Sequence, residues 1–178
     1  LPGQYSIKLL ARDAVSGRIG TFQSAFTVPN LNRETTTVRM SSVVLGSQRV
    51  GRGDALFAVR QKIVADAANP LVSNGTKLLP SVTRVFSASR DLYVRFDVYR
   101  MDTVTNGPLL AFVSLYKDGQ IVFDSAPVKV NVGSAVTPFR FTVPLSRLVP
   151  GTYDCQVSVL DLGQQKAKFW RAPIVVVR

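Results

Sequence analysis

The sequence predicts an all-β chain built as a β-sandwich, on three observations. Short runs in which apolar and polar residues alternate recur along the chain, as in strands that are half buried in a sheet. Turn signals such as Pro-Gly and Asp-Gly separate these runs. One unit of turn, strand, loop and strand occurs twice, at the two ends of the 178 residues. Strands and turns at this spacing are typical of two antiparallel sheets packed face to face.

The internal repeat aligns residues 1–29 with residues 149–177 without a gap. The opening letters "LPGQY" match "VPGTY" at residues 149–153, and apolar positions then coincide along both copies. The further matched pairs are Ile7 with Cys155, Leu9 with Val157, Ala11 with Val159, Asp13 with Asp161, Phe22 with Trp170, Phe26 with Ile174, and Val28 with Val176.

Each copy of the repeat predicts a β-hairpin. Pro-Gly makes a turn, an alternating run follows, and a polar loop at 13–17 or 161–165 leads into a returning run at 21–28 or 168–177. A two-stranded hairpin is marginal in water unless its apolar face is covered. We expect the first hairpin to be covered either by the rest of the chain or by another copy of it, with strand pairing at its edges.

The Pro-Gly-x-Tyr entry into each strand resembles the tyrosine corner of immunoglobulin-like and fibronectin type III sandwiches. Residues 153–155 also have the Tyr-x-Cys spacing of an immunoglobulin strand, but the chain has no second cysteine, so we expect Cys155 to be a small buried hydrophobic residue. The predicted domains are 1–30, the C-terminal hairpin of a truncated sandwich domain, and 31–178, an immunoglobulin-like β-sandwich with a long insertion at 47–80.

Several strands are expected in the second domain before the repeated hairpin. An Asp-Gly turn at 118–119 predicts a hairpin, and the insertion contains a possible short helix at 55–68. We expect any specific contact surface to lie in this insertion, because long loops in compact domains are often functional. The predicted strands are 35–45, 81–87, 90–100, 109–116, 120–128 and 139–143. In the 90–100 run, Leu92, Val94, Phe96 and Val98 are expected to face inward, and Tyr93, Arg95, Asp97 and Tyr99 outward.

The charge balance is strongly basic, with 22 Lys and Arg against 11 Asp and Glu and a formal charge of +11. This favours either an anionic partner or a basic, solvated sheet surface, and the dispersal of the charges favours the second. Cations lie beside aromatic residues at Tyr93/Arg95 and at 169–171, a pattern that also occurs in sites for single-stranded nucleic acid. We expect them instead to be ordinary sheet residues, with the aromatic side chains in the core and arginines covering the outer face, so no specific nucleic-acid partner is predicted. No apolar run approaches the roughly 20 residues of a membrane helix, so no membrane span is expected in this fragment.

Residue types that carry catalysis are scarce. The chain has no histidine and one cysteine, its acidic residues are scattered without an Asp-x-Asp, and it has no Gly-x-Ser-x-Gly motif. We therefore assign no catalytic, cofactor-binding or metal-binding residue and expect no cofactor; an enzyme would need Asp, Lys or Tyr side chains assembled from distant positions. Asp13 and Asp161 are expected to be turn residues that bond their own backbone.

Two short motifs have competing interpretations. Arg52-Gly53-Asp54 spells a cell-attachment tripeptide, but three residues often match by chance. Asn74-Gly75-Thr76 is a glycosylation acceptor and also an ordinary Asn-Gly turn, and we expect the turn.

A family resemblance covers most of the chain. The phrases "PGTYDCQVSVLDLGQQKAKFWRAPIVVV", "NPLVSNGTKLLPSVTRVFSASRDLYV" and "LPGQYSIKLLARDAVSGRIGTFQSAFTVPNL" resemble the C-terminal region of acidobacterial VWFA-related domain proteins. In that family a signal peptide and a von Willebrand A domain precede this region. The resemblance implies an exported protein, secreted, periplasmic or at the cell surface. The Asp-x-Ser-x-Ser metal site of the A domain is absent here.

These observations together predict a non-enzymatic structural or interaction module of an exported bacterial protein, next to an adhesion-type von Willebrand A domain. Its partner would be another protein or a second copy, bound through edge strands. The alternative is a carbohydrate- or polyanion-binding module. An opening on Leu1-Pro2-Gly3, inside a motif, also suggests a piece of a longer polypeptide with any targeting signal upstream.

Overall fold

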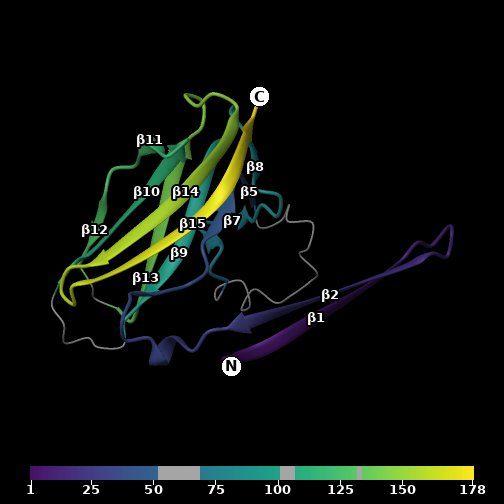
Figure 1. Cartoon of the computed structure of the whole chain (residues 1–178), viewed down its shortest axis with the longest axis horizontal. Helices are drawn as coiled ribbons and strands as arrows, with labels where there is room; N and C mark the ends of the chain where they lie inside the picture. The colour runs from purple at the N-terminus through teal and green to yellow at the C-terminus, as the bar shows by residue number, and fades with distance from the viewer. Residues whose placement is uncertain (52–68, 101–106, 132–133) are drawn as a thin grey trace. The chain divides into compact units, whose positions relative to one another are not determined.

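The computed structural model describes residues 1–51, 69–100, 107–131 and 134–178 (Figure 1). Nearly all of the regular structure in these residues is β-strand, with one 3-10 turn at Leu31–Arg33 and no α-helix, which confirms the predicted all-β class. Two compact units are present, Leu1–Thr35 and Thr36–Arg178. The helix predicted at 55–68 and the Arg52-Gly53-Asp54 tripeptide lie outside the described residues.

The first unit is a two-stranded antiparallel hairpin of β1 (Gly3–Arg12) and β2 (Ile19–Val28). The loop between the strands is closed by backbone bonds between Asp13 and both Gly17 and Arg18, each 2.9 Å long. Gly17 has a φ of 69°, a left-handed conformation that glycine adopts without steric cost. The predicted first hairpin is therefore present.

The second unit contains a six-stranded sheet in the order β11-β10-β14-β15-β8, with β12 also paired to β10. Its neighbours are antiparallel except β15 and β8, which run parallel. The strands are β8 (Val85–Ser87), β10 (Leu109–Lys117), β11 (Gln120–Asp124), β12 (Val128–Val130), β14 (Gly151–Asp161) and β15 (Lys166–Val177).

The Asp-Gly turn between β10 and β11 forms as predicted. Asp118 and Gly119 have φ values of 51° and 78°, the positive pair that a tight hairpin turn requires. The run predicted at 81–87 is shorter than expected, since only its last three residues form β8. Its first residues bend instead, and the side chain of Ser81 accepts a bond from the Arg84 backbone at 3.1 Å.

A four-stranded sheet in the order β13-β9-β3, with β4 also paired to β9, makes the other layer. Its strands are β3 (Arg39–Met40), β4 (Val44–Gly46), β9 (Asp91–Tyr99) and β13 (Val136–Pro144). The single strand predicted at 35–45 is thus wrong in its extent, because it splits at Ser41. There the Ser41 hydroxyl accepts the Asp97 backbone N–H at 2.9 Å, so a side chain replaces one bond of the backbone ladder.

The core lies between these two sheets and follows the alternation of the strands. Leu92, Val94, Phe96 and Val98 of β9 are buried, as predicted, and Phe96 stacks on Phe139 with ring centroids 5.3 Å apart. The other large core side chains are Phe86, Leu109, Val113, Leu115, Phe141, Val143, Leu145, Tyr153, Val157, Ile174 and Val176.

A third, small sheet, β5-β7-β6, occupies part of the predicted insertion. Its strands are β5 (Gln48–Gly51), β6 (Val72–Ser73) and β7 (Thr76–Leu79), so the described part of 47–80 is a folded sheet rather than a long loop. Asn74 and Gly75 join β6 to β7 with φ values of 50° and 74°, which confirms the turn interpretation. The strands of this sheet are only two to four residues long, so an alternating sequence pattern could not predict them.

Candidate functional site

The two hairpins of the repeat have the same strand register. Tyr5 pairs with Phe26 in the first hairpin, and Tyr153 pairs with Ile174 at the equivalent place in the second. The agreement extends along the whole of β1, from Gly3 opposite Val28 to Arg12 opposite Ile19, which matches Gly151 opposite Val176 to Leu160 opposite Ala167. The repeat found in the sequence is therefore a repeat of structure.

The two tyrosines also make the same hydrogen bond. The Tyr5 hydroxyl donates to the backbone carbonyl of Leu1 at 2.5 Å, and the Tyr153 hydroxyl donates to the carbonyl of Val149. Each bond runs back four residues along the chain, as in the corner that the Pro-Gly-x-Tyr pattern predicts. Local sequence is sufficient to build this corner, because the accepting carbonyl lies only four residues earlier in the chain.

The surroundings of the two hairpins differ. Tyr5, Ile7 and Leu9 are 41%, 47% and 59% exposed, whereas Tyr153 is 3% exposed and Val157 fully buried. On the returning strand, Phe22 and Phe26 are also exposed, and Tyr5 and Phe26 stack with centroids 5.7 Å apart. The strands β14 and β15 are flanked by β10 and β8, while β1 and β2 form a sheet of two. We call the side of β1–β2 that carries Tyr5, Ile7, Leu9, Phe22 and Phe26 the apolar hairpin face.

Asp13 and Asp161 both cap their hairpin loops, as predicted. Asp13 accepts a bond from the Val15 backbone at 2.9 Å, and Asp161 accepts one from the Gln164 backbone at 2.9 Å. Bonds from the Ser16 hydroxyl and then from the Val15 backbone hold the pKa of the Asp13 carboxyl below its usual range.

Asp161 has a second role that sequence reasoning missed. It forms a buried, two-pronged ion pair with Arg100 at the end of β9, with Nε donating to Oδ2 at 2.9 Å. The two side chains are 5% and 4% exposed. This pair ties the repeated hairpin to the opposite sheet, and no local pattern predicts a partner so far away in the sequence.

Cys155 is fully buried, as expected, opposite Leu115 on one side and Ala172 on the other. Burial raises the pKa of the Cys155 thiol to about 12. A thiol in this state is protonated at neutral pH and is a poor nucleophile or metal ligand.

The aromatic and basic residues near the C-terminus make the packing and surface contacts that are usual in a β-sheet. Trp170 packs against the core, and the Arg171 guanidinium lies 4.7 Å from the centroid of the Tyr116 ring. Arg171 also pairs with Asp154 at 3.3 Å, where both side chains are about half exposed, so this ion pair adds little stability.

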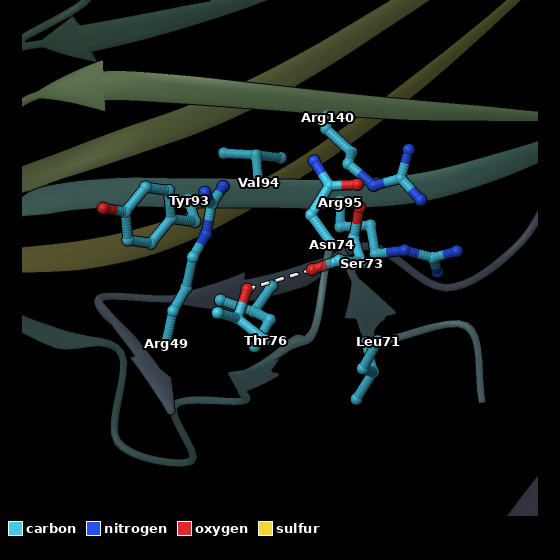
Figure 2. Close-up of a pocket in the computed structure, with 10 residues that line it drawn as sticks. Arg49, Leu71, Ser73, Asn74, Thr76, Tyr93, Val94, Arg95 and Arg140 are labelled. Carbon is cyan, nitrogen blue, oxygen red and sulfur yellow. Dashed lines mark hydrogen bonds between the residues drawn. The ribbon is translucent and has the colours of Figure 1, made fainter. Parts of the chain in front are cut away.

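A pocket of about 160 Å³, with a mixed polar and apolar lining, lies where the small sheet meets the outer side of β9 and β13 (Figure 2). Its polar lining is formed by Arg49 of β5, Arg95 of β9 and Arg140 of β13, with Ser73, Asn74 and Thr76 around the tight turn. Figure 2 shows Arg49 beside Tyr93, and the guanidinium carbon of Arg49 is 3.9 Å from the centroid of that ring.

Arg95 and Asp97 lie on the outer side of β9, as predicted, but they are covered there. They alternate with the core residues of β9, but they are only 8% and 7% exposed. Arg95 donates two bonds to Asp97, at 3.1 and 3.3 Å, and its own Nε is buried without a hydrogen-bond partner. The small sheet explains this burial at Arg95, because its residues line the same pocket.

Among residues 1–51, 69–100, 107–131 and 134–178, no group of three or more His, Cys, Asp or Glu side chains is placed to hold a metal ion. No helix in that part of the chain is long and apolar enough to cross a membrane. No protein-family model matches the chain, and no curated protein matches it significantly.

Proposed function

We propose that this chain is a non-enzymatic structural and interaction module, and that its apolar hairpin face is covered by β-strands from outside the hairpin. The observation that carries the proposal is the contrast between the two copies of the repeat. The same register buries Tyr153 and Ile174 in a core but leaves Tyr5 and Phe26 exposed at 41% and 44%.

The repeat itself specifies what should cover the hairpin. In the second copy, a strand pairs along the outer edge of β14, another pairs along β15, and a facing sheet covers the apolar side. A partner for β1–β2 therefore needs a free strand edge and an apolar sheet face. In a solution of this chain alone, the hairpin of a second copy supplies both, so we expect self-association.

The buried ionisable groups of the described residues support a non-enzymatic role. Asp97 and Asp161 are held in ion pairs with arginines, and the Cys155 thiol is sealed in the core. A general base or nucleophile needs access to a substrate, and these groups lack it.

The remaining parts of the proposal rest on the resemblance to the acidobacterial VWFA-related domain proteins. On that resemblance, the module is immunoglobulin-like and belongs to an exported bacterial protein, secreted, periplasmic or on the cell surface, where it stands next to an adhesion-type von Willebrand A domain.

The direct experiment measures molar mass by size-exclusion chromatography with light scattering. We expect the full chain to associate as its concentration rises and a chain that begins at Asn32 to remain monomeric. Leu9→Asp should abolish association, because a charge on the apolar hairpin face is costly to bury. The matched control is Leu162→Asp, which makes the same substitution at a position 51% exposed in the loop of the second hairpin. A molar mass that stays at the monomer value of each of the four proteins at every concentration would contradict the proposal.

A further inference from the structure

The arginine pocket has an excess of positive charge. Three arginines line it, Arg49, Arg95 and Arg140, and the guanidinium of Arg95 is paired with Asp97. Figure 2 shows the Arg49 guanidinium over Tyr93, whereas the Arg95 and Arg140 side chains extend the other way. Within the described part of the chain, no carboxylate lies within ion-pair distance of Arg49 or Arg140. Two arginines at the exposed rim of the pocket, Arg49 and Arg140, are therefore not neutralised by a described carboxylate.

Strand register forces two of these arginines together. Arg95 of β9 and Arg140 of β13 lie directly opposite each other in the antiparallel pair. Opposed residues in such a pair have Cβ atoms roughly 5 Å apart, and like charges there are destabilising. Figure 2 shows the two side chains extending the same way from their neighbouring strands. An anion between them would turn this repulsion into attraction.

The Nε of Arg95 is a buried donor in the wall of the pocket. The Arg95 side chain is 10% exposed, and its Nε is buried without a hydrogen-bond partner, although two of its other nitrogens bond to Asp97. Buried polar atoms in folded proteins nearly always have a partner, and an unsatisfied one suggests a local rearrangement, an absent water or an absent ion. Because this Nε is fully buried, the Arg95 side chain would have to shift for the Nε to meet a ligand in the pocket. A guanidinium N–H is a donor only, so the missing partner is an acceptor.

The rest of the lining fits an oxyanion. Ser73 and Asn74 add a hydroxyl and an amide group to the lining, while the Thr76 hydroxyl already donates to the Ser73 carbonyl at 3.0 Å (Figure 2). Arg49 is held in place by its stacking on Tyr93. The volume of about 160 Å³ is below the roughly 300–1,000 Å³ of sites for drug-sized ligands, so it suits one small charged group. Guanidinium groups bind carboxylate and sulfate with paired, charge-assisted bonds.

We propose that the pocket between Arg49, Arg95 and Arg140 binds one oxyanion group, a carboxylate or a sulfate, of a small or terminal acidic ligand. The site lies wholly within Thr36–Arg178 and is independent of the hairpin proposal. It would give the strongly basic chain a specific anion site in addition to its dispersed surface charge.

The experiment follows backbone NMR signals of the full chain during titration with sodium glucuronate, with sodium sulfate and with neutral glucose, at constant ionic strength. We expect glucuronate or sulfate to shift the signals of Asn74, Thr76 and Arg95 in a saturable manner, and glucose to leave them in place. The anion that shifts them identifies the group as a carboxylate or a sulfate. Shifts by glucose as large as those by glucuronate, or no saturable shift with either anion, would overturn the proposal.

Two matched variants separate a built site from general attraction. Arg140→Gln should weaken anion binding roughly tenfold, which corresponds to about 1.4 kcal/mol. Arg147→Gln removes the same charge from an exposed position in the turn after β13 and should leave binding unchanged. An equal loss in both variants would show that net charge alone attracts the anion and would overturn the proposal.

A second measurement distinguishes this role from a structural one. Without anion, Arg140→Gln should raise the melting temperature slightly, because it removes the repulsion between Arg95 and Arg140. The same variant should lose the stabilisation that the bound anion gives the natural chain. A lower melting temperature without anion, together with an unchanged response to it, would assign Arg140 to the fold alone and overturn the proposal.

Discussion

The two hairpins of this chain share a sequence pattern and a register but differ in what surrounds them. β14–β15 is bordered by β10 and β8 and covered by the sheet that contains β9, whereas β1–β2 is a sheet of two strands. Tyr153 is 3% exposed and Tyr5 41% exposed, although their hydroxyls make the same backbone bond. Local sequence therefore determines the hairpin, and neighbouring strands determine whether its apolar side becomes a core.

The equivalent aspartates show the same contrast in electrostatics. Asp13 and Asp161 both close a loop, but among the described residues only Asp161 has an arginine from another sheet against it. The repeat thus offers paired positions at which one substitution can be made in both settings. The predictions below compare such pairs, from the largest expected effect to the smallest.

The largest difference is expected in thiol reactivity at the equivalent positions 7 and 155. In the natural chain, Cys155 should resist a thiol reagent, because burial raises its pKa to about 12 and leaves on the order of a thousandfold less thiolate than an ordinary cysteine has. Ile7→Cys, made together with Cys155→Ala, should react at the rate of an exposed thiol in a dilute sample. Similar rates at the two positions would contradict the difference in burial.

The raised pKa of the Cys155 thiol also makes the stability of the fold depend on pH. Because the folded pKa exceeds the ordinary value of 9.0, the contribution of Cys155 is present below about pH 9 and is lost as the pH rises toward about 12. Chemical unfolding of the natural chain and of Cys155→Ala should therefore show a difference that shrinks over this interval. A difference that stays constant with pH would contradict the burial of the thiol.

Removing the two equivalent aspartates should have unequal effects on stability. Asp161→Ala leaves the buried Arg100 guanidinium without its carboxylate and should lower the free energy of unfolding of residues 36–178 by about 3–5 kcal/mol. Asp13→Ala should leave that unfolding transition unchanged. Denaturant melts followed by the fluorescence of Trp170 measure both, and equal losses would contradict the assigned role of the ion pair.

Truncating the apolar side chains of the two returning strands gives a slightly smaller contrast. Ile174→Ala opens a cavity in the core and should cost about 2–5 kcal/mol. Phe26→Ala, at the equivalent position, should change the stability of the monomer by less than about 0.5 kcal/mol. It should instead weaken the self-association of the full chain, and a large loss of monomer stability would indicate that the hairpin is already part of a core.

The smallest effect is expected in the loop of the first hairpin at low pH. The pKa of Asp13 is lowered first by the bond from Ser16 and then by that from Val15. The ionised carboxylate therefore stabilises the loop above about pH 4, and this stabilisation is lost as the pH falls further. NMR signals of residues 14–17 should move toward random-coil positions in this interval. Ser16→Ala should shift the midpoint upward, and an unchanged midpoint would contradict the bond.

The sequence correctly predicted features that are determined by residues close together in the chain, such as the buried side of a strand or the type of a turn. The alternation of β9 correctly predicted that Leu92, Val94, Phe96 and Val98 are buried, and the repeat correctly predicted two similar hairpins. Positive-φ turns at Asn74-Gly75 and Asp118-Gly119 were equally predictable, because the residue type and the turn geometry are directly linked.

The features that sequence missed depend on strands far apart in the chain. The polar side chains of β9 were predicted to point outward, but nothing in their pattern indicated that residues of the small sheet of β5, β6 and β7 would line a pocket with Arg95. The pairing of Arg100 with Asp161 and the meeting of Arg95 with Arg140 follow from sheet topology and register, which no local pattern contains. Strands of two to four residues are also too short to give a periodic signal.

The most direct test of the central claim is amide hydrogen exchange along β1 and β14 of the full chain at increasing protein concentration. If strands of a second copy cover the first hairpin, the amides on the free edge of β1 become protected as concentration rises, while those of β14 stay protected throughout. Protection of β1 that equals that of β14 at the lowest concentration would contradict the claim, as would β1 amides that remain unprotected at every concentration.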